Sequence, residues 1–151
     1  MKAYVAAAFS RRDEARLVAE ILISLGVQVT SRWLYEEKPP EQDFSEFMSE
    51  SALIDVEDIL AANVLVRISD KELMNRNDLL PSGLVSGARM AGTMLAWREK
   101  KHVVIMGGRQ MAFDYLPGIR VVDDEVGLID YIKQGLDCEM WDAIVGNVGC
   151  C

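Results

Sequence analysis

Short apolar runs alternate along this chain with longer segments in which apolar residues recur every three or four positions. Five of the runs are rich in β-branched residues and are bounded by polar residues or glycine, which is typical of buried parallel strands. These runs are residues 5–9, 27–30, 64–68, 103–106 and 119–122. The pattern therefore predicts five short strands, each covered on both faces of a sheet.

Helical periodicity fills the intervals between these strands. The first predicted helix starts at the sequence Ser10-Arg11-Arg12-Asp13, which resembles a capping box, and Gly26 closes it. Its apolar stripe consists of Ala15, Val18, Ile21, Leu22 and Leu25. A second helix is expected over about residues 44–61, with an apolar side formed by Met48, Ala52, Val56, Ile59 and Leu60. Two more are expected over about 86–100 and 124–133.

Strict alternation of strand and helix predicts right-handed crossovers and a parallel sheet with helices on both faces. We expect a flavodoxin-like (Rossmann-like) α/β fold, a three-layer sandwich with a five-stranded parallel sheet in the order 2-1-3-4-5. One domain covers residues 1–136, and residues 137–151 form a tail with the spacing of a short docking helix. Ligands of such sheets bind at the carboxyl ends of the strands, so the loops after Phe9, Trp33, Ile68 and Met106 should surround one cleft.

The net charge and the lengths of the apolar runs limit the classes of partner that this chain could bind. A net charge of −8 argues against polymeric nucleic acid, because such affinity comes mainly from basic side chains that neutralise phosphates. A free nucleotide remains compatible with this net charge, because it needs only a local cluster of hydrogen-bond donors. No apolar run approaches the roughly 18 residues of a membrane span, and the N-terminus lacks the layout of a signal peptide. We therefore expect a cytoplasmic protein that binds a small molecule and no membrane.

Cysteine and histidine usage argues against a metal centre. The three cysteines, Cys138, Cys150 and Cys151, form neither a CxxC pair nor an even framework. This usage fits a reducing compartment without structural zinc. A single histidine, His102, cannot build a His-based triad or metal cluster. No metal and no cofactor are expected.

Two predicted helix N-termini face the expected cleft. At Phe9-Ser10-Arg11-Arg12 the chain leaves a strand for a helix, so N–H groups, a hydroxyl and guanidinium groups converge where a phosphate would be stabilised. The segment Ser86-Gly87-Ala88-Arg89 opens the third helix toward the same place. A helix cap with solvated arginines explains the first turn equally well, and an N-cap role explains Ser86.

Several segments recur in the order found in a known family. They are residues 5–10, 30–33, 55–66, 86–96 and 113–118. In this order they resemble the nucleoside 2-deoxyribosyltransferases and their relatives, the 2′-deoxynucleoside 5′-monophosphate N-glycosidases, over about residues 2–133. No single motif is highly specific, but the ordered set is.

The resemblance implies an enzyme site that has lost its carboxylates. Family members cleave the bond between base and sugar with a glutamate nucleophile on the third helix, and Gly92 stands at that position here. The family also places an aspartate just before the third strand, near the reacting base, where this chain has Asn63. Neither residue can act as nucleophile, acid or base at neutral pH. Gly92 has a second explanation, since a glycine lets a helix pack closely on its neighbour.

Other residues could take part. Tyr4 stands where the family keeps a tyrosine near the nucleophile, although a core role explains it as well. Asp70 follows the third strand, as does Glu72, and could supply a displaced acid, but exposed loop acids are usually only solvated. At the position of Ser86 the transferases tend to have an aspartate that holds the sugar 5′-hydroxyl, whereas the monophosphate hydrolases have a serine. With Ser10 and Arg11, Ser86 favours a 5′-phosphorylated ligand.

Apolar side chains on the third helix, Met90, Met94 and Trp97, bear on assembly. Family members form dimers or higher oligomers through this region, and residues near Phe113 complete the neighbour's site. The resemblance thus implies a homo-oligomer, while ordinary core packing explains the methionines equally well.

The leading functional hypothesis is a catalytically impaired protein that binds or sequesters a nucleotide or nucleoside derivative. Its expected ligand-binding residues are Phe9, Ser10, Arg11, Trp33, Ser86, Gly87 and Arg89. The alternative is an active deoxyribosyltransferase or nucleoside 5′-monophosphate N-glycosidase that uses a displaced acid such as Asp70. A third hypothesis is an interaction protein with a vestigial cleft.

Overall fold

The structure, a computed structural model, describes residues 1–37, 44–69 and 87–134, with only the backbone of 44–47 and 87–89. Five parallel strands form one sheet in the order β2-β1-β3-β4-β5, as predicted from the sequence. The strands are β1 (Lys2–Ala6), β2 (Gln28–Val29), β3 (Val64–Ile68), β4 (His102–Met106) and β5 (Ile119–Val122). The central strand β3 is buried along its whole length, as expected for a strand covered on both faces.

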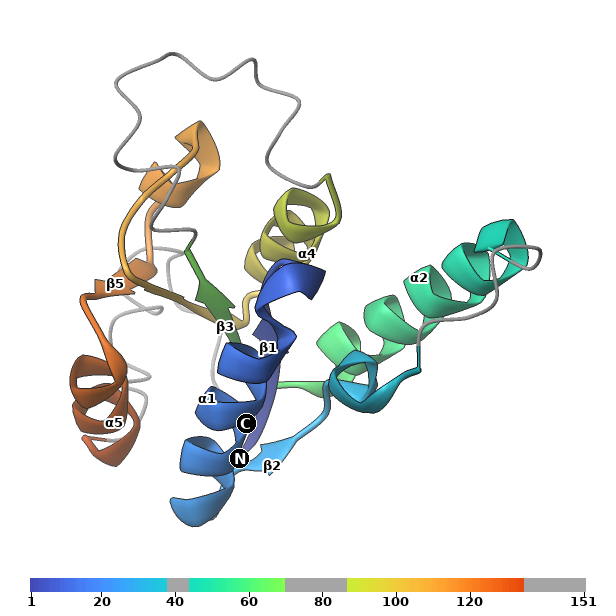
Figure 1. The fold of residues 1–151 in the computed structure, drawn as a ribbon. Coiled ribbons are helices and arrows are strands. Elements are labelled where there is room, and N and C mark those ends of the chain that lie inside the picture. Colours follow the sequence, from blue (N-terminus) through green and yellow to red (C-terminus); the bar gives the residue numbers. More distant parts are fainter. Residues whose placement is uncertain (38–43, 70–86, 135–151) are drawn as a thin grey trace.

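Helices cover both faces of the sheet (Figure 1). Helix α1 (Arg12–Ser24) packs with α5 (Glu125–Lys133), and α2 (Phe44–Ala61) packs with α4 (Gly87–Arg98), which gives the three layers. The described residues also contain the short 3-10 turns η1 (Phe9–Arg11), η2 (Arg32–Tyr35) and η4 (Ala112–Tyr115). No helix in the described ranges is long and apolar enough to cross a membrane.

The start of α1 differs from the expected capping box. The chain first makes the 3-10 turn η1, so the N-cap of α1 is Arg11, and no side chain caps the helix by a hydrogen bond. Asp13 and Glu14 supply negative charge in the first turn instead, where it offsets the helix dipole. The predicted inward stripe is largely confirmed, with Ala15, Val18 and Leu22 buried.

The predicted apolar side of α2 is wrong except at Ile59, which is buried. Met48, Val56 and Leu60 are all exposed, as is Leu53. The inner surface of α2 is instead partly polar, because Asp58 is buried and hydrogen-bonded to the segment around η2. In Figure 1 the N-terminal end of α2 extends away from the sheet. Periodicity alone could not reveal this, because the exposed side chains of α2 are apolar while a carboxylate, Asp58, lies on its inner side.

Two side chains replace part of the short edge strand β2. Among the described residues, β2 ends at Val29, and no strand pairs with Val5 of β1 on that side. Its N–H donates to Ser31 Oγ (2.6 Å), and its carbonyl accepts from Trp33 Nε1 (2.8 Å). These bonds satisfy backbone groups that would otherwise be buried without partners.

Candidate functional site

The carboxyl ends of β1, β3 and β4 are tied together by polar contacts. Arg11 Nη1, just after β1, donates to the carbonyl of Ser69. Ser69 follows β3, and its hydroxyl donates to the carbonyl of Gly108 beyond β4. Gly107 and Gly108 have φ values of 95° and 119°, a conformation that side chains rarely adopt. This carboxyl edge is where open parallel sheets bind ligands.

The expected anion site is only partly described. Ser10 is exposed, but Ser86 lies outside the described residues, as does Asp70, and the side chain of Arg89 is likewise not described. Gly87 forms the first residue of α4. Arg11 already holds a carboxylate: its Nε and Nη2 donate to Glu14 at 2.7 and 2.5 Å. A phosphate at Arg11 would have to displace Glu14, so the joint anion site of Ser10, Arg11 and Ser86 stays a prediction.

Two aromatic side chains lie at the end of β1. Trp33 is only 8% exposed, and its indole N–H is committed to the carbonyl of Val5. Phe9 is 51% exposed, tilted against Trp33 at a centroid distance of 6.4 Å. The guanidinium of Arg12 lies 4.8 Å from the centre of the Phe9 ring. Phe9 therefore offers an accessible aromatic surface for a planar ligand, whereas the buried Trp33 packs against the Phe9 ring.

The structure does not bring the two family positions together. A Cβ at Gly92 would lie 3.2 Å from Ile59 Cδ1 and 3.9 Å from Leu65 Cδ1. A side chain there would enter the packing between α2, α4 and β3, which supports the close-packing explanation of this glycine. Asn63 is exposed at the amino end of β3, and its Oδ1 accepts from the backbone N–H of Lys2 (2.8 Å). Asn63 thus lies at the edge of the sheet opposite to the carboxyl edge.

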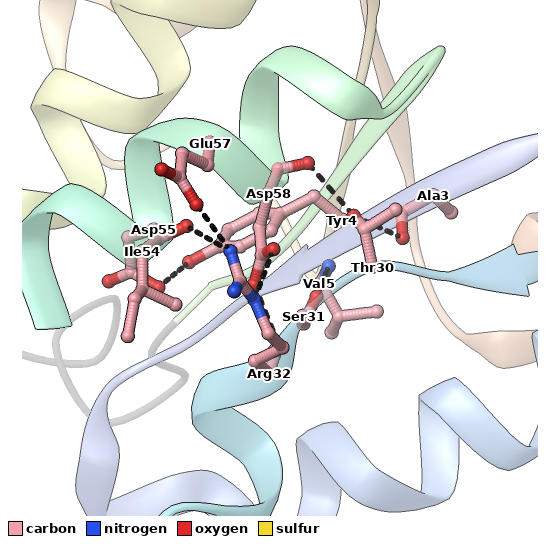
Figure 2. Close-up of polar contacts among 10 residues, drawn as sticks. All are labelled: Ala3, Tyr4, Val5, Thr30, Ser31, Arg32, Ile54, Asp55, Glu57 and Asp58. Atoms are coloured by element: carbon pink, nitrogen blue, oxygen red, sulfur yellow. Dashed lines mark hydrogen bonds and ion pairs between the residues drawn. The ribbon is translucent and has the colours of Figure 1, made fainter.

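A carboxyl group that the sequence analysis missed lies beside Tyr4. The Tyr4 hydroxyl donates to Asp55 Oδ1 of α2 at 2.7 Å (Figure 2). Burial raises the pKa of Asp55 above its usual value, and the Glu36 and Asp58 carboxylates add to this, while the bond from Tyr4 opposes it. Burial and the neighbouring Asp55 also raise the pKa of Tyr4, so the phenol remains a proton donor. Asp55 opens one of the segments that resemble the family, but no role could be assigned to it from the sequence, because Asp55 reaches Tyr4 only through the packing of α2 on β1.

A second polar group holds α2 at this place. Arg32 donates from its backbone N–H and its Nε to the two oxygens of Asp58, both at 2.8 Å, and from Nη2 to Glu57 at 2.9 Å (Figure 2). Thr30 Oγ1 donates to the Asp58 carbonyl at 2.9 Å. Because Asp55 lies one helical turn before Asp58, these bonds also fix Asp55 against Tyr4. Within the described ranges no cluster of acidic, histidine or cysteine side chains could hold a metal ion.

Comparison with known proteins places the fold. No protein-family model and no curated protein matches the chain, but solved structures do. A 2-deoxyribosyltransferase from the psychrotolerant bacterium Bacillus psychrosaccharolyticus has a TM-score of 0.63 at 16% identity, covering 87% of this chain and 92% of that one. A conserved protein from Enterococcus faecalis V583 has a TM-score of 0.60 at 20% identity, over 89% and 98% of the two chains.

A further match is the CMP N-glycosidase of Clostridium botulinum, with a TM-score of 0.52 at 10% identity over 89% and 99% of the two chains. Such identities establish likeness of fold alone. The chain thus has the α/β fold of a nucleoside deoxyribosyltransferase, as the ordered sequence segments implied.

Proposed function

We propose that this protein binds a nucleoside or nucleotide derivative at the carboxyl edge of its sheet and does not cleave the glycosidic bond by the route of the enzymes it resembles. Similarity of fold to a 2-deoxyribosyltransferase and a CMP N-glycosidase supports the ligand class. The observation that carries the loss of activity is α4 itself. None of its twelve residues is a carboxylate, and position 92 packs against Ile59.

The exposed ring of Phe9 supports a planar base as part of the ligand. Stacking on one aromatic side is worth about 1–3 kcal/mol per base and does not depend on which base is bound. A 5′-phosphate remains part of the proposal through Ser10, Arg11 and Ser86. In that case Glu14 is the group that the phosphate replaces at Arg11.

A thermal-shift screen of the full chain against nucleosides and their 5′-monophosphates, combined with an assay for free base, tests this function. A ligand at about 100 times its Kd should add about 2.7 kcal/mol of stability. Phe9→Ala should raise the Kd of the bound ligand by about tenfold or more. Leu17→Ala is the matched control, because Leu17 is similarly exposed but lies on α1. A screen in which nothing in either class stabilises the chain would refute the proposal.

An active enzyme with a displaced acid is the second candidate, and the Tyr4–Asp55 pair favours it. A carboxyl group with a raised pKa beside a phenol can hold and deliver a proton, which departure of a base requires. Release of free base by the unmodified protein, lost in Asp55→Asn, would establish this candidate. Release that persists in Asp55→Asn and is lost in Asp70→Asn would assign the acid to Asp70 instead.

The proposal includes a cytoplasmic homodimer or higher homo-oligomer. Its support is the outer surface of α2, where Met48, Leu53, Val56 and Leu60 are between 43% and 66% exposed. The last three follow the three- and four-residue spacing of one helical stripe. Contiguous apolar surface of this kind is typical of a contact with another molecule.

A further inference from the structure

A buried ion pair lies near the carboxyl end of the central strand. Arg67 is the one charged residue of β3, whose sequence is VLVRI, and its side chain is 1% exposed. It contacts Asp114 of η4, which is fully buried, through Nη2 and Oδ2. An arginine in the middle of a sheet costs several kcal/mol of desolvation that only good geometry repays. Such a residue needs an explanation beyond packing.

The pair is satisfied on one side only. Asp114 Oδ2 accepts from Arg67 Nη2 and also from the backbone N–H groups of Gln110 (2.7 Å) and Met111 (3.1 Å). Its second oxygen, Oδ1, has no hydrogen-bond partner among the described residues, and the same holds for Arg67 Nη1. A two-point arginine–carboxylate contact would have satisfied both atoms. The one-point contact leaves a buried donor and a buried acceptor unpaired, which destabilises the fold unless another group pairs with them.

These two atoms belong to the edge of the sheet where the ligand is proposed to bind. Arg67 pairs with Ala6 of β1 in the last pair of that ladder, and with Ile105 of β4 one residue before the end of the other. Ser69, two residues further along, bonds the loop after β4. Side chains two residues apart in a strand share a face, so Arg67 lies on the same face as Leu65, the one covered by α4. Asp114 reaches this place from η4, and Arg109 Nε holds its carbonyl at 3.0 Å.

We infer that Arg67 Nη1 and Asp114 Oδ1 form a recognition pair for a neutral ligand group that presents a hydrogen-bond acceptor beside a donor. The inference rests on the proposed function and names the polar chemistry of that same site. The amide-like edge of a nucleobase has this character, as do the hydroxyl groups of a ribosyl ring. An anion would be attracted by Nη1 but repelled by Oδ1, so a phosphate is not the group read here.

A double substitution separates recognition from a merely structural role. Arg67→Met with Asp114→Asn removes both charges, and the asparagine oxygen can still accept from Gln110 and Met111. Replacing a buried ion pair by uncharged groups of similar size often leaves a fold intact. Arg16→Met with Asp13→Asn is the matched control, because it makes the same chemical change in an arginine–aspartate pair on the surface of α1. Asp114→Asn alone is a milder variant that keeps every donor of Arg67.

Binding is measured by calorimetry on the full chain with cytosine, adenine, 2-deoxyribose, deoxycytidine, deoxyadenosine and their 5′-monophosphates. The wild-type protein should bind at least one nucleoside or monophosphate. The Arg67/Asp114 variant should bind it at least about tenfold more weakly, and the Arg16/Asp13 variant within about threefold of wild type. Asp114→Asn alone should also weaken binding, because its amide can turn the acceptor into a donor.

The outcomes separate the two proposals. Wild-type protein that binds none of these compounds overturns the proposed function and this inference with it. Wild-type binding that the Arg67/Asp114 variant and Asp114→Asn both retain overturns the inference alone. Loss that includes free cytosine or adenine assigns the pair to the base edge, and loss confined to 2-deoxyribose and the nucleosides assigns it to the sugar. An effect on the monophosphates but not on the nucleosides would contradict the neutral-group assignment.

Discussion

Lys100 and Gly26 occupy equivalent positions at the ends of two helices. At the end of α1, Gly26 N–H bonds the carbonyl of Ile23, and Val27 N–H bonds that of Leu22. At the end of α4, Lys100 N–H bonds Trp97, and the following N–H bonds Ala96 in the same pattern. Both residues have positive φ, 81° for the glycine and 55° for the lysine. This is the Schellman motif, in which glycine is preferred because it has no Cβ to strain.

Lys100→Gly should therefore raise the free energy of unfolding by about 0.5–1 kcal/mol, net of the greater entropy of glycine in the unfolded chain. Gly26→Ala should lower it by about 1 kcal/mol. A Cβ at Gly26 meets no atom within 4 Å, so its cost is conformational alone. Urea unfolding of both variants measures these changes. A destabilised Lys100→Gly variant would show that the lysine side chain stabilises the fold by more than its strained backbone destabilises it.

The raised pKa of Asp55 predicts a dependence of stability on pH. A carboxyl group whose pKa is raised on folding stabilises the fold fully below its unfolded pKa, and this contribution is lost as pH rises through the folded pKa. Asp55→Asn can keep the bond from Tyr4 without a charge. Its stability relative to wild type, measured by urea unfolding, should therefore grow as the pH rises above the ordinary carboxyl pKa of 3.8, and should level off once the folded-state carboxyl group has ionised.

Asp123→Asn, an exposed change, is the control and should follow the wild-type pH dependence. Parallel curves for wild type and Asp55→Asn would contradict the assignment of a raised pKa to Asp55.

Among the elements, α2 is where sequence reasoning fell short. The strands and the other helices were predictable in kind because one period decides each of them: β3 is apolar except at Arg67, and α1 has one inward stripe. The first strand nevertheless covers Lys2–Ala6 rather than residues 5–9, and Phe9 belongs to η1. Helix α2 has apolar residues on its outer side and Asp58 on its inner side, and only the partners Arg32 and Thr30, distant in sequence, explain why. The same limit hid the contact between Asp55 and Tyr4, although Tyr4 stands where the family keeps a tyrosine and Asp55 opens a segment that resembles the family.

The outer stripe of α2 predicts self-association. Leu53→Glu with Leu60→Glu should convert an oligomer to a monomer, because each change places a charge in a buried apolar contact. Light scattering after size-exclusion chromatography measures this, with Leu17→Glu on α1 as an equally exposed control. If wild type is already a monomer at micromolar concentration, or if Leu17→Glu alone dissociates it, the stripe is not the contact.

At the scale of the whole molecule, the sequence predicted the sheet order, but not how side chains fill the carboxyl edge where the site is expected. Arg11, Arg67 and Asp114 converge there from three separate segments. Their partners depend on loop geometry that no spacing encodes. At Gly92 the sequence did identify the position in the family pattern. It could not show that a side chain there would point toward Ile59, because the rotation of α4 about its axis decides this.

Ser31 and Trp33, whose side chains bond the backbone of Val5 beyond the end of β2, also affect solubility. A sheet's outermost strand offers unpaired N–H and carbonyl groups to any other extended chain, which is how many proteins aggregate. Here β2 has only two residues, and beyond it Ser31 and Trp33 turn inward to occupy the bonding groups of Val5. A foreign strand therefore finds almost no template on that side. Protection against edge-to-edge pairing is thus built from an indole and a hydroxyl rather than from charge or proline.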